Sequence, residues 1–144
     1  MAINFYTPKF YVFNNFSAHA VEFEGKLYPT SEHAYQAAKC TDPKGKEEIR
    51  NARSPERGKT LANEVYKEAR DPDWQNKKVG VMERVLRAKL AQHPEAVEAL
   101  QESGQDDIVE DSPTDYFWGE GADGSGQNML GKLWMKLRAE HTQP

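Results

Sequence analysis

The chain has 144 residues, 38% of them hydrophobic, with a single cysteine and a formal net charge of −4. This length predicts one domain, residues 1–144, which would bury about two-thirds of the surface that its unfolded chain exposes. One cysteine excludes an intrachain disulfide framework. No segment approaches the ~18 consecutive apolar residues that span a bilayer, and the N-terminus lacks a signal-like apolar core. We therefore expect a soluble, cytoplasmic protein that does not associate with membranes.

The charge balance is mildly acidic, with 23 Asp and Glu against 19 Lys and Arg. A domain that binds nucleic acid mainly through bulk charge usually has a basic isoelectric point, so this class is disfavoured. A nucleotide in a pocket needs only a few well-placed cations and is compatible with this composition.

The first thirty residues have the composition of strands. Residues 3–6 and 20–24 are rich in aromatic and β-branched side chains. Because Glu24-Gly25-Lys26 forms a turn signal between apolar segments, residues 20–28 are predicted to be a hairpin.

Helix signals dominate the rest of the chain. Thr30-Ser31-Glu32 is a hydroxyl cap followed by an acidic first turn, which predicts a helix to about Cys40. Asp42-Pro43 and Ser54-Pro55 begin two further helices by the same chemistry. The longest helical pattern covers residues 73–92, with Val81, Met82, Val85, Leu86 and Leu90 on one face.

The last third mixes helices with short strands. Helices are expected from Pro94 to about Glu102 and along the apolar stripe from Met129 to Leu137, and strands at 107–110 and 116–118. The expected fold class is therefore α+β: a mostly helical single domain with five to six helices and a small, mainly antiparallel sheet.

Metal chemistry has little support. The four histidines include no i,i+4 pair, and Cys40 has no cysteine partner. Because a zinc site needs several nitrogen or sulfur ligands at close spacing, we expect no metal site and no cofactor.

The glycine-rich segment 119–126 matches G-x-G-x-x-G at Gly119, Gly121 and Gly124. It is not a Rossmann fingerprint, because the residues that follow have the pattern of one helix and supply no second parallel strand. Two interpretations stay open. The loop and the following helix start offer free backbone N–H groups to a phosphate, or the loop is a flexible surface turn.

The helix that begins after Thr30 carries a polar face. Glu32, Gln36 and Lys39 are spaced i, i+4, i+7, with His33 and Tyr35 alongside. Such a face is usually solvated. The rest of the helix is built from small residues, however, and a helix with so little apolar bulk packs weakly if its polar face meets only water. The alternative is a polar face that lines a cleft.

Aromatic residues stand next to acids in two places, Asp73-Trp74 and Asp115-Tyr116-Phe117-Trp118. Aromatic planes beside carboxylates suit a ligand with a flat base and a cationic transition state. The competing interpretation places Trp74 and Trp118 in the core.

Taken together, these residues resemble the NADAR family, which includes the YbiA-like N-glycosidases. The resemblance runs from residue 3 to about residue 138, with Asn14 standing where relatives often carry Ser. The matching stretches are Ile3-Asn4-Phe5-Tyr6, Asn15-Phe16, Gly25-Lys26, Pro29-Thr30-Ser31-Glu32-His33, Gln36-Ala37, Lys39, Ser54-Pro55, Trp74, Met82, Leu86-Arg87-Ala88-Lys89, Asp115, Trp118-Gly119, Gly121, Asn128 and Leu130-Gly131.

The resemblance implies hydrolysis of an N-glycosidic bond at ribose C1. The implied substrate is ADP-ribose on guanine in nucleic acid, or else a phosphorylated ribosyl intermediate of riboflavin biosynthesis. An ADP-ribosyltransferase toxin that acts on the same substrate is an implied partner. The expected catalytic residues are Glu32, Lys39 and Asp115. The expected substrate-binding residues are His33, Tyr35, Gln36, Trp74, Trp118, Gly119, Gly121 and Asn128.

Cleavage of a ribose C–N bond builds positive charge on the sugar, which a carboxylate stabilises. Glycosidases usually use two carboxylates, and we assign Glu32 to the sugar and Asp115 to positioning the ribose or the base. Lys39 permits a second route, in which its neutral amine attacks C1 and forms a Schiff base. Lys39 is roughly 10 Å from Glu32 along the helix axis, and the sequence does not decide between the routes.

Two other functional classes compete with an enzyme. A non-catalytic ADP-ribose-binding module would need the aromatic residues and a phosphate loop, but not Glu32 and Lys39 together. An adaptor protein would expose a large apolar patch, and the sequence contains no surplus apolar stripe.

Overall fold

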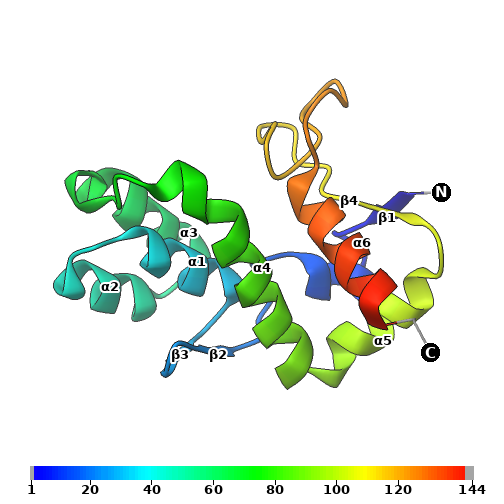
Figure 1. The fold of residues 1–144 in the computed structure, drawn as a ribbon, viewed down its shortest axis with the longest axis horizontal. Coiled ribbons are helices and arrows are strands. Elements are labelled where there is room, and N and C mark those ends of the chain that lie inside the picture. Colours follow the sequence, from blue (N-terminus) through cyan, green and yellow to red (C-terminus); the bar gives the residue numbers. More distant parts are fainter. Residues whose placement is uncertain (1, 142–144) are drawn as a thin grey trace. The chain divides into compact units, whose positions relative to one another are not determined.

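The computed structural model describes residues 2–141 (Figure 1). The chain is mostly helical with two small two-stranded sheets, which confirms the α+β class. Its backbone groups into two compact units, which we call unit 1 (residues 1–14 and 93–144) and unit 2 (residues 15–92). The expectation of one domain over residues 1–144 stays a prediction. Within residues 2–141, no helix combines the length and the apolar character needed to cross a membrane.

Unit 2 begins with the expected hairpin. Its strands β2 and β3 pair antiparallel, with Val21 opposite Tyr28. Glu24 and Gly25 both have positive φ angles, 50° and 82°. A two-residue hairpin turn of this kind requires that conformation, which glycine adopts without strain. The elements of unit 2 are β2 (Val21–Phe23), β3 (Lys26–Tyr28), α1 (Ser31–Lys39), α2 (Pro43–Arg50), α3 (Pro55–Thr60), the π-helix η2 (Leu61–Val65), the 3-10 helix η3 (Lys67–Ala69) and α4 (Trp74–Gln92).

Side-chain caps fix the starts of three of these helices. Thr30 accepts a hydrogen bond from the backbone of His33, Asp42 from Lys44, and Ser54 from Arg57. The sequence predicted all three starts, because a capping hydrogen bond depends on residues only two or three positions apart.

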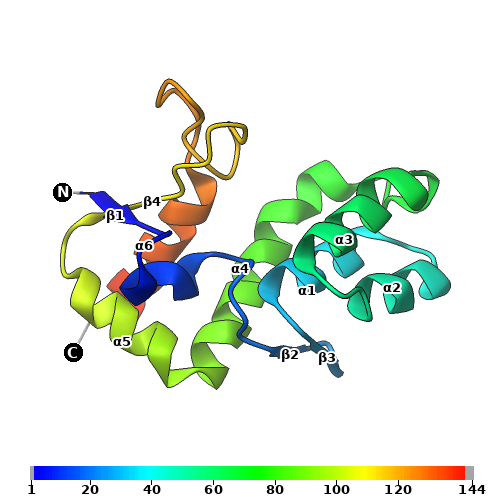
Figure 2. The same ribbon diagram turned by 180° about the vertical axis from the view of Figure 1, so that it is seen from behind.

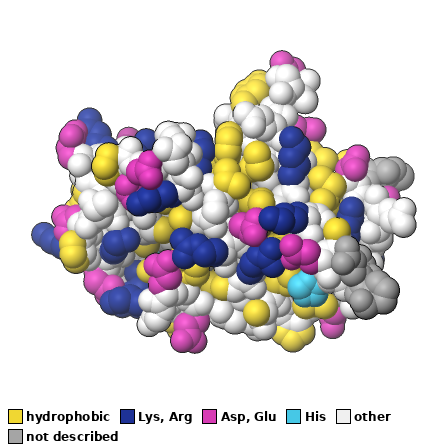
Figure 3. Space-filling view, in the orientation of Figure 1, with side chains coloured by type: hydrophobic (Ala, Val, Ile, Leu, Met, Phe, Trp, Pro, Cys, Tyr) yellow, Lys and Arg dark blue, Asp and Glu magenta, His cyan; other side chains and the backbone are white. Residues whose placement is uncertain are grey.

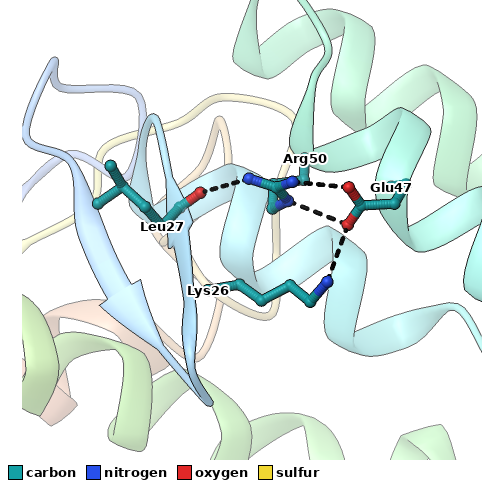
Figure 4. A network of polar contacts seen from close by, with 4 residues as sticks. All are labelled: Lys26, Leu27, Glu47 and Arg50. Atoms are coloured by element: carbon teal, nitrogen blue, oxygen red, sulfur yellow. Dashed lines mark hydrogen bonds and ion pairs between the residues drawn. The ribbon is translucent and has the colours of Figure 1, made fainter.

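Helix α1 is the centre of unit 2 and contacts α2, α3 and α4 (Figure 2). The apolar stripe predicted for α4 is confirmed, since its five residues are all buried. Arg50 of α2 joins this helix to the hairpin: it donates to the Leu27 carbonyl at 3.3 Å and makes a bidentate contact with the Glu47 carboxylate (Figure 4). Lys26 reaches the same carboxylate at 3.4 Å. Arg50 and Lys26 hold the pKa of Glu47 down, at about 2.

Unit 1 joins the two ends of the chain. Strand β1 (Ala2–Asn4) pairs parallel with β4 (Asp107–Val109), with Ile3 opposite Ile108. The unit also contains the 3-10 helix η1 (Pro8–Phe13), α5 (Pro94–Ser103) and α6 (Met129–His141). The core includes Trp134, whose ring lies 4.9 Å from that of Phe13 and whose Nε1 donates to the Phe13 carbonyl at 3.1 Å.

Two sequence-based assignments in unit 1 are wrong. Residues 8–13 form a 3-10 helix inside the stretch that resembled strands, because Pro8 provides a helical first position. Residues 116–118 form no strand. On the face shown in Figure 3, cationic and acidic side chains are interspersed, in keeping with the small net charge.

Candidate active site

The start of α1 is anchored by His33. Its Nε2 lies 3.0 Å from the Ala52 carbonyl, so this nitrogen donates, and Nδ1 then accepts from the Thr30 hydroxyl at 2.8 Å. Burial lowers the pKa of His33, which favours the neutral ring that this arrangement needs. Nε2 therefore joins α1 to the segment between α2 and α3, and Nδ1 contacts the residue that caps α1. The prediction that His33 binds substrate stays untested.

The polar face of α1 is buried. Glu32 and Lys39 are each 8% exposed and Gln36 is 2% exposed, so the interpretation of a solvated face is wrong. Gln36 Nε2 donates to Glu32 Oε2 at 2.7 Å, which orients the carboxylate. Glu and Lys are almost never this buried unless they have partners or a function. The alternative, a polar face that lines a cleft, stays a prediction.

Two polar atoms on this helix lack a partner. Among the described residues, Gln36 Oε1 and Ser31 Oγ are buried and make no hydrogen bond. Leaving such a group unpaired costs about 1–3 kcal/mol. Gln36 Oε1 is an amide oxygen and can only accept a hydrogen bond, and the amide nitrogen of the same side chain donates to Glu32. A sugar hydroxyl next to Glu32 would satisfy it.

Lys39 lies among two aromatic rings and an amide. Its Nζ is 5.4 Å from the Tyr35 ring centre and 5.9 Å from that of Trp74, and it donates to Asn63 Oδ1 at 2.9 Å. Burial, followed by the charge of Arg70, lowers the pKa of Lys39 to about 8, against the opposing effect of Glu32. A lysine in this state carries an appreciable neutral fraction near pH 7 and can act as a nucleophile.

The rings of Trp74 and Tyr35 lie beside Lys39 and contact each other. Their ring centres are 5.3 Å apart at an interplanar angle of 58°. Trp74 is the first residue of α4 and is buried. The structure thus brings four of the predicted residues of unit 2, Glu32, Tyr35, Gln36 and Lys39, together with Trp74.

Sequence reasoning missed two neighbours of Lys39. Asn63 lies in the π-helix η2, and its Oδ1 also accepts from Arg70 Nη2 at 3.2 Å. A π-helix re-aims side chains and often marks a functional site. No local pattern in the sequence predicts the π-helix. Arg70 could have been suspected, because it is a cation directly before the segment Asp71-Pro72-Asp73-Trp74.

The other predicted residues belong to unit 1. Asp115 Oδ1 accepts from the backbone N–H of Phe117 at 3.0 Å and of Trp118 at 2.8 Å. This turn replaces the expected strand, because an aspartate side chain competes for the amides that a strand would use. Phe117 and Trp118 meet edge to face, with ring centres 4.9 Å apart.

The glycine segment folds onto itself. Gly121 has a φ of 72°, and a side chain there would run into the Tyr116 ring. At Gly119 a Cβ would come within 2.8 Å of the Glu110 carbonyl. The amides of residues 124 and 126–130 donate to carbonyls of residues 116–121. The interpretation of these amides as free phosphate donors is therefore wrong.

Asn128 closes the same loop. Its Nδ2 donates to the Ile108 carbonyl at 3.0 Å, and its Oδ1 accepts from Glu110 N at 2.8 Å. Asn128 has a φ of 50°, a left-handed conformation that asparagine tolerates. The side chain thus joins the loop to β4, and its predicted role in substrate binding stays a prediction.

Glu110 is a titratable residue of unit 1 that the sequence did not single out. It is buried, and Tyr6 donates to its Oε1 at 3.2 Å. Burial raises the pKa of Glu110 to about 7, so the carboxyl is partly protonated at neutral pH. Within the described residues, no group of three or more His, Cys, Asp or Glu side chains is arranged to hold a metal ion.

Comparisons with known proteins agree with the resemblance. The NADAR domain model matches residues 4–141. The N-glycosidase YbiA of Escherichia coli is 39% identical over 140 residues, covering 96% of this chain and 87% of YbiA. The NMR structure of that protein superposes with a TM-score of 0.87, covering 98% of this chain and 84% of that one. The chloroplastic riboflavin biosynthesis protein PYRR of Zea mays is 35% identical, covering 91% of this chain and 23% of PYRR. The chain belongs to the NADAR family and has a YbiA-type N-glycosidase among its relatives.

Proposed function

We propose that this protein is an N-glycosidase that cleaves the bond between ribose C1 and the nitrogen of an attached base. The observation that carries the proposal is the buried face of α1, where Glu32, Gln36 and Lys39 lie less than a tenth exposed. Similarity to an N-glycosidase over 96% of the chain supports the same reaction.

Lys39 is the nucleophile in the route that we favour. Its neutral amine forms a bond to C1, and the electron pair of the C1–N bond leaves with the base, which takes up a proton. The Lys39 nitrogen, now bonded to C1, then loses a proton; its electron pair forms the C=N bond of a Schiff base while the C1–O4 bond breaks and O4 takes up a proton, which opens the ribose. Water adds to C1, the amine leaves, and the free sugar and Lys39 are regenerated.

Glu32 and Gln36 serve the sugar in this scheme. The Glu32 carboxylate stabilises positive charge at C1 and accepts the proton that the amine loses. Gln36 fixes that carboxylate through its 2.7 Å hydrogen bond and offers Oε1 to a ribose hydroxyl. The roles expected of Asp115 and Trp118, which belong to unit 1, stay predictions.

ADP-ribose attached to guanine in nucleic acid is the substrate that we propose first. A single modified base that is already unstacked can enter a pocket without a basic binding surface. Phosphorylated ribosyl intermediates of riboflavin biosynthesis are the second candidate, and the similarity to the riboflavin biosynthesis protein of Zea mays favours them.

A product assay separates these substrates. The protein is incubated with guanine-ADP-ribosylated DNA and, in parallel, with a phosphorylated riboflavin-pathway intermediate, and the products are identified by mass spectrometry. Release of free ADP-ribose supports the first substrate, and release of the base only from the metabolite supports the second. Binding of ADP-ribose without release of any product would refute the proposal and indicate a binding module.

A further inference from the structure

Asn63 contacts the Lys39 amine and the Arg70 guanidinium with one and the same oxygen. Lys39 Nζ donates to Asn63 Oδ1 at 2.9 Å, and Arg70 Nη2 donates to it at 3.2 Å. An amide oxygen has two lone pairs, so it accepts both hydrogen bonds. The two donor nitrogens therefore lie at most about 6 Å apart.

The backbone holds Arg70 beside the end of α1. Arg70 lies opposite Cys40, the residue after Lys39, in an isolated antiparallel bridge. Next to this bridge, the backbone N–H of Asp71 donates to the Lys39 carbonyl at 3.0 Å. The segment that carries Arg70 and the helix that carries Lys39 are thus joined by their main chains, so the guanidinium stays within reach of the oxygen that Lys39 uses.

The orientation of the Asn63 amide decides what becomes of the Lys39 lone pair. A neutral amine has two N–H groups and one lone pair, and this lone pair is what attacks carbon. With Oδ1 facing Lys39, the amine donates and its lone pair is left for the substrate. A half-turn of the amide would bring Nδ2 there instead. Its N–H would then donate to the lone pair and block the attack.

Arg70 opposes this half-turn. A guanidinium has N–H donors and no acceptor, and it keeps its charge at all ordinary pH values. A turned amide would set its own N–H groups against the guanidinium and lose a charge-assisted hydrogen bond. Arg70 therefore keeps Asn63 Oδ1 facing Lys39, whether the amine is charged or neutral.

We propose that Asn63 and Arg70 are positioning residues that keep the lone pair of the Lys39 amine free for attack on C1. Asn63 orients the amine, and Arg70 holds the Asn63 amide in the orientation that leaves the lone pair free. This inference rests on the proposed function, in which Lys39 is the nucleophile. Both residues act through Lys39 and form no bond to the reacting atoms.

The test measures kcat and KM for release of the base by Arg70→Gln and Arg70→Lys at pH 9. Glutamine can accept a hydrogen bond from a turned Asn63, whereas a charged lysine only donates. Arg70→Gln should lower kcat about 5- to 10-fold, the effect of one hydrogen bond to the lone pair, and leave KM within about twofold. Arg70→Lys should stay within about twofold of wild type. A loss that comes from KM alone would assign Arg70 to substrate binding and overturn the inference.

The choice of pH separates orientation from charge. The charged groups that act on Lys39 are Glu32, Arg70, Lys59 and Lys78, and the variants remove only Arg70. With a pKa of about 8, Lys39 is mostly neutral at pH 9. Removing one exposed charge about 6 Å away moves the pKa by roughly one unit at most, which changes the neutral fraction at pH 9 by no more than about twofold.

A double variant shows whether Arg70 acts through Asn63. Asn63→Ala should lower kcat about tenfold, because the amine loses its acceptor. Adding Arg70→Gln to Asn63→Ala should cause no further loss, since no amide remains to turn. Independent losses that multiply would overturn the inference. Arg84→Gln, which removes an exposed arginine paired with Glu24, is the matched control and should behave as wild type.

Reductive methylation separates this inference from the proposed function. The Lys39 lone pair adds to formaldehyde, water leaves, and hydride from cyanoborohydride reduces the C=N bond. Peptide mass spectrometry compares the rate at Lys39 with that at the exposed Lys44. A 5- to 10-fold slower reaction of Lys39 in Arg70→Gln supports the inference even if no N-glycoside is cleaved. Cleavage by wild type, with kcat and methylation that Arg70→Gln leaves unchanged, would retain the function and overturn the inference.

Discussion

The pH dependence of the reaction follows from the state of Lys39. With a pKa of about 8, roughly one amine in ten is neutral at pH 7. At the ordinary value of 10.5 the neutral fraction would be roughly 1 in 3,000, so the site supplies about 300 times more nucleophile. Below pH 8, kcat/KM should therefore fall about tenfold for each pH unit.

The assay measures kcat/KM from pH 6 to 9.5 for wild type and two variants. Lys39→Arg keeps the positive charge and removes the neutral amine, so it should lower kcat/KM by about 100-fold or more at pH 8 and abolish the acid limb. Lys44→Arg, at an exposed lysine of α2, should behave as wild type. A profile that stays flat down to pH 6, or a Lys39→Arg variant within threefold of wild type, would refute the role of Lys39.

Three further predictions concern stability. Burial raises the pKa of Glu110 from 4.5 to about 7. The free energy of unfolding should therefore fall by up to about 1.4 kcal/mol per pH unit as the pH rises from 4.5 to 7. Urea titrations of Glu110→Gln should not show this pH dependence. Burial lowers the pKa of Lys89 from 10.5 to about 7. Stability should therefore rise between pH 7 and 10.5, and Lys89→Met should flatten that rise; an unchanged slope would contradict the assignment. Gly121→Ala should destabilise the folded protein by at least about 1 kcal/mol, because φ is positive there and the new Cβ would meet the Tyr116 ring. Gly80→Ala, at an open position in a helix, should stabilise the folded protein by about 0.5–1 kcal/mol. Thermal melts measure both effects.

The sequence predicted the features that depend on neighbouring residues. The helix starts at Ser31, Pro43 and Pro55 follow from caps that act over two or three positions. The hairpin at 21–28 follows from its turn residues in the same way. Periodicity placed Glu32, Gln36 and Lys39 on one face of α1 but did not decide whether that face was buried, and the family resemblance gave these residues an expected function.

The sequence alone did not predict the features that depend on contacts between distant residues. The parallel pair of β1 with β4 joins residues about 100 positions apart. The π-helix that brings Asn63 to Lys39 depends on the packing of α1 against its neighbours. Aromatic content at 116–118 suggested a strand, but the Asp115 carboxylate takes the two amides that a strand would need. Short-range composition did not reveal that competition.

The most direct test of the central claim, that the buried face of α1 carries out the cleavage, is kcat for release of the base by Glu32→Gln. The substitution preserves size and removes the carboxylate beside Lys39. It is measured at saturating substrate beside wild type and the exposed control Glu56→Gln, with folding checked by circular dichroism. The account predicts a loss of about 100- to 10,000-fold for Glu32→Gln and none for the control. A folded Glu32→Gln protein within threefold of wild type would contradict it.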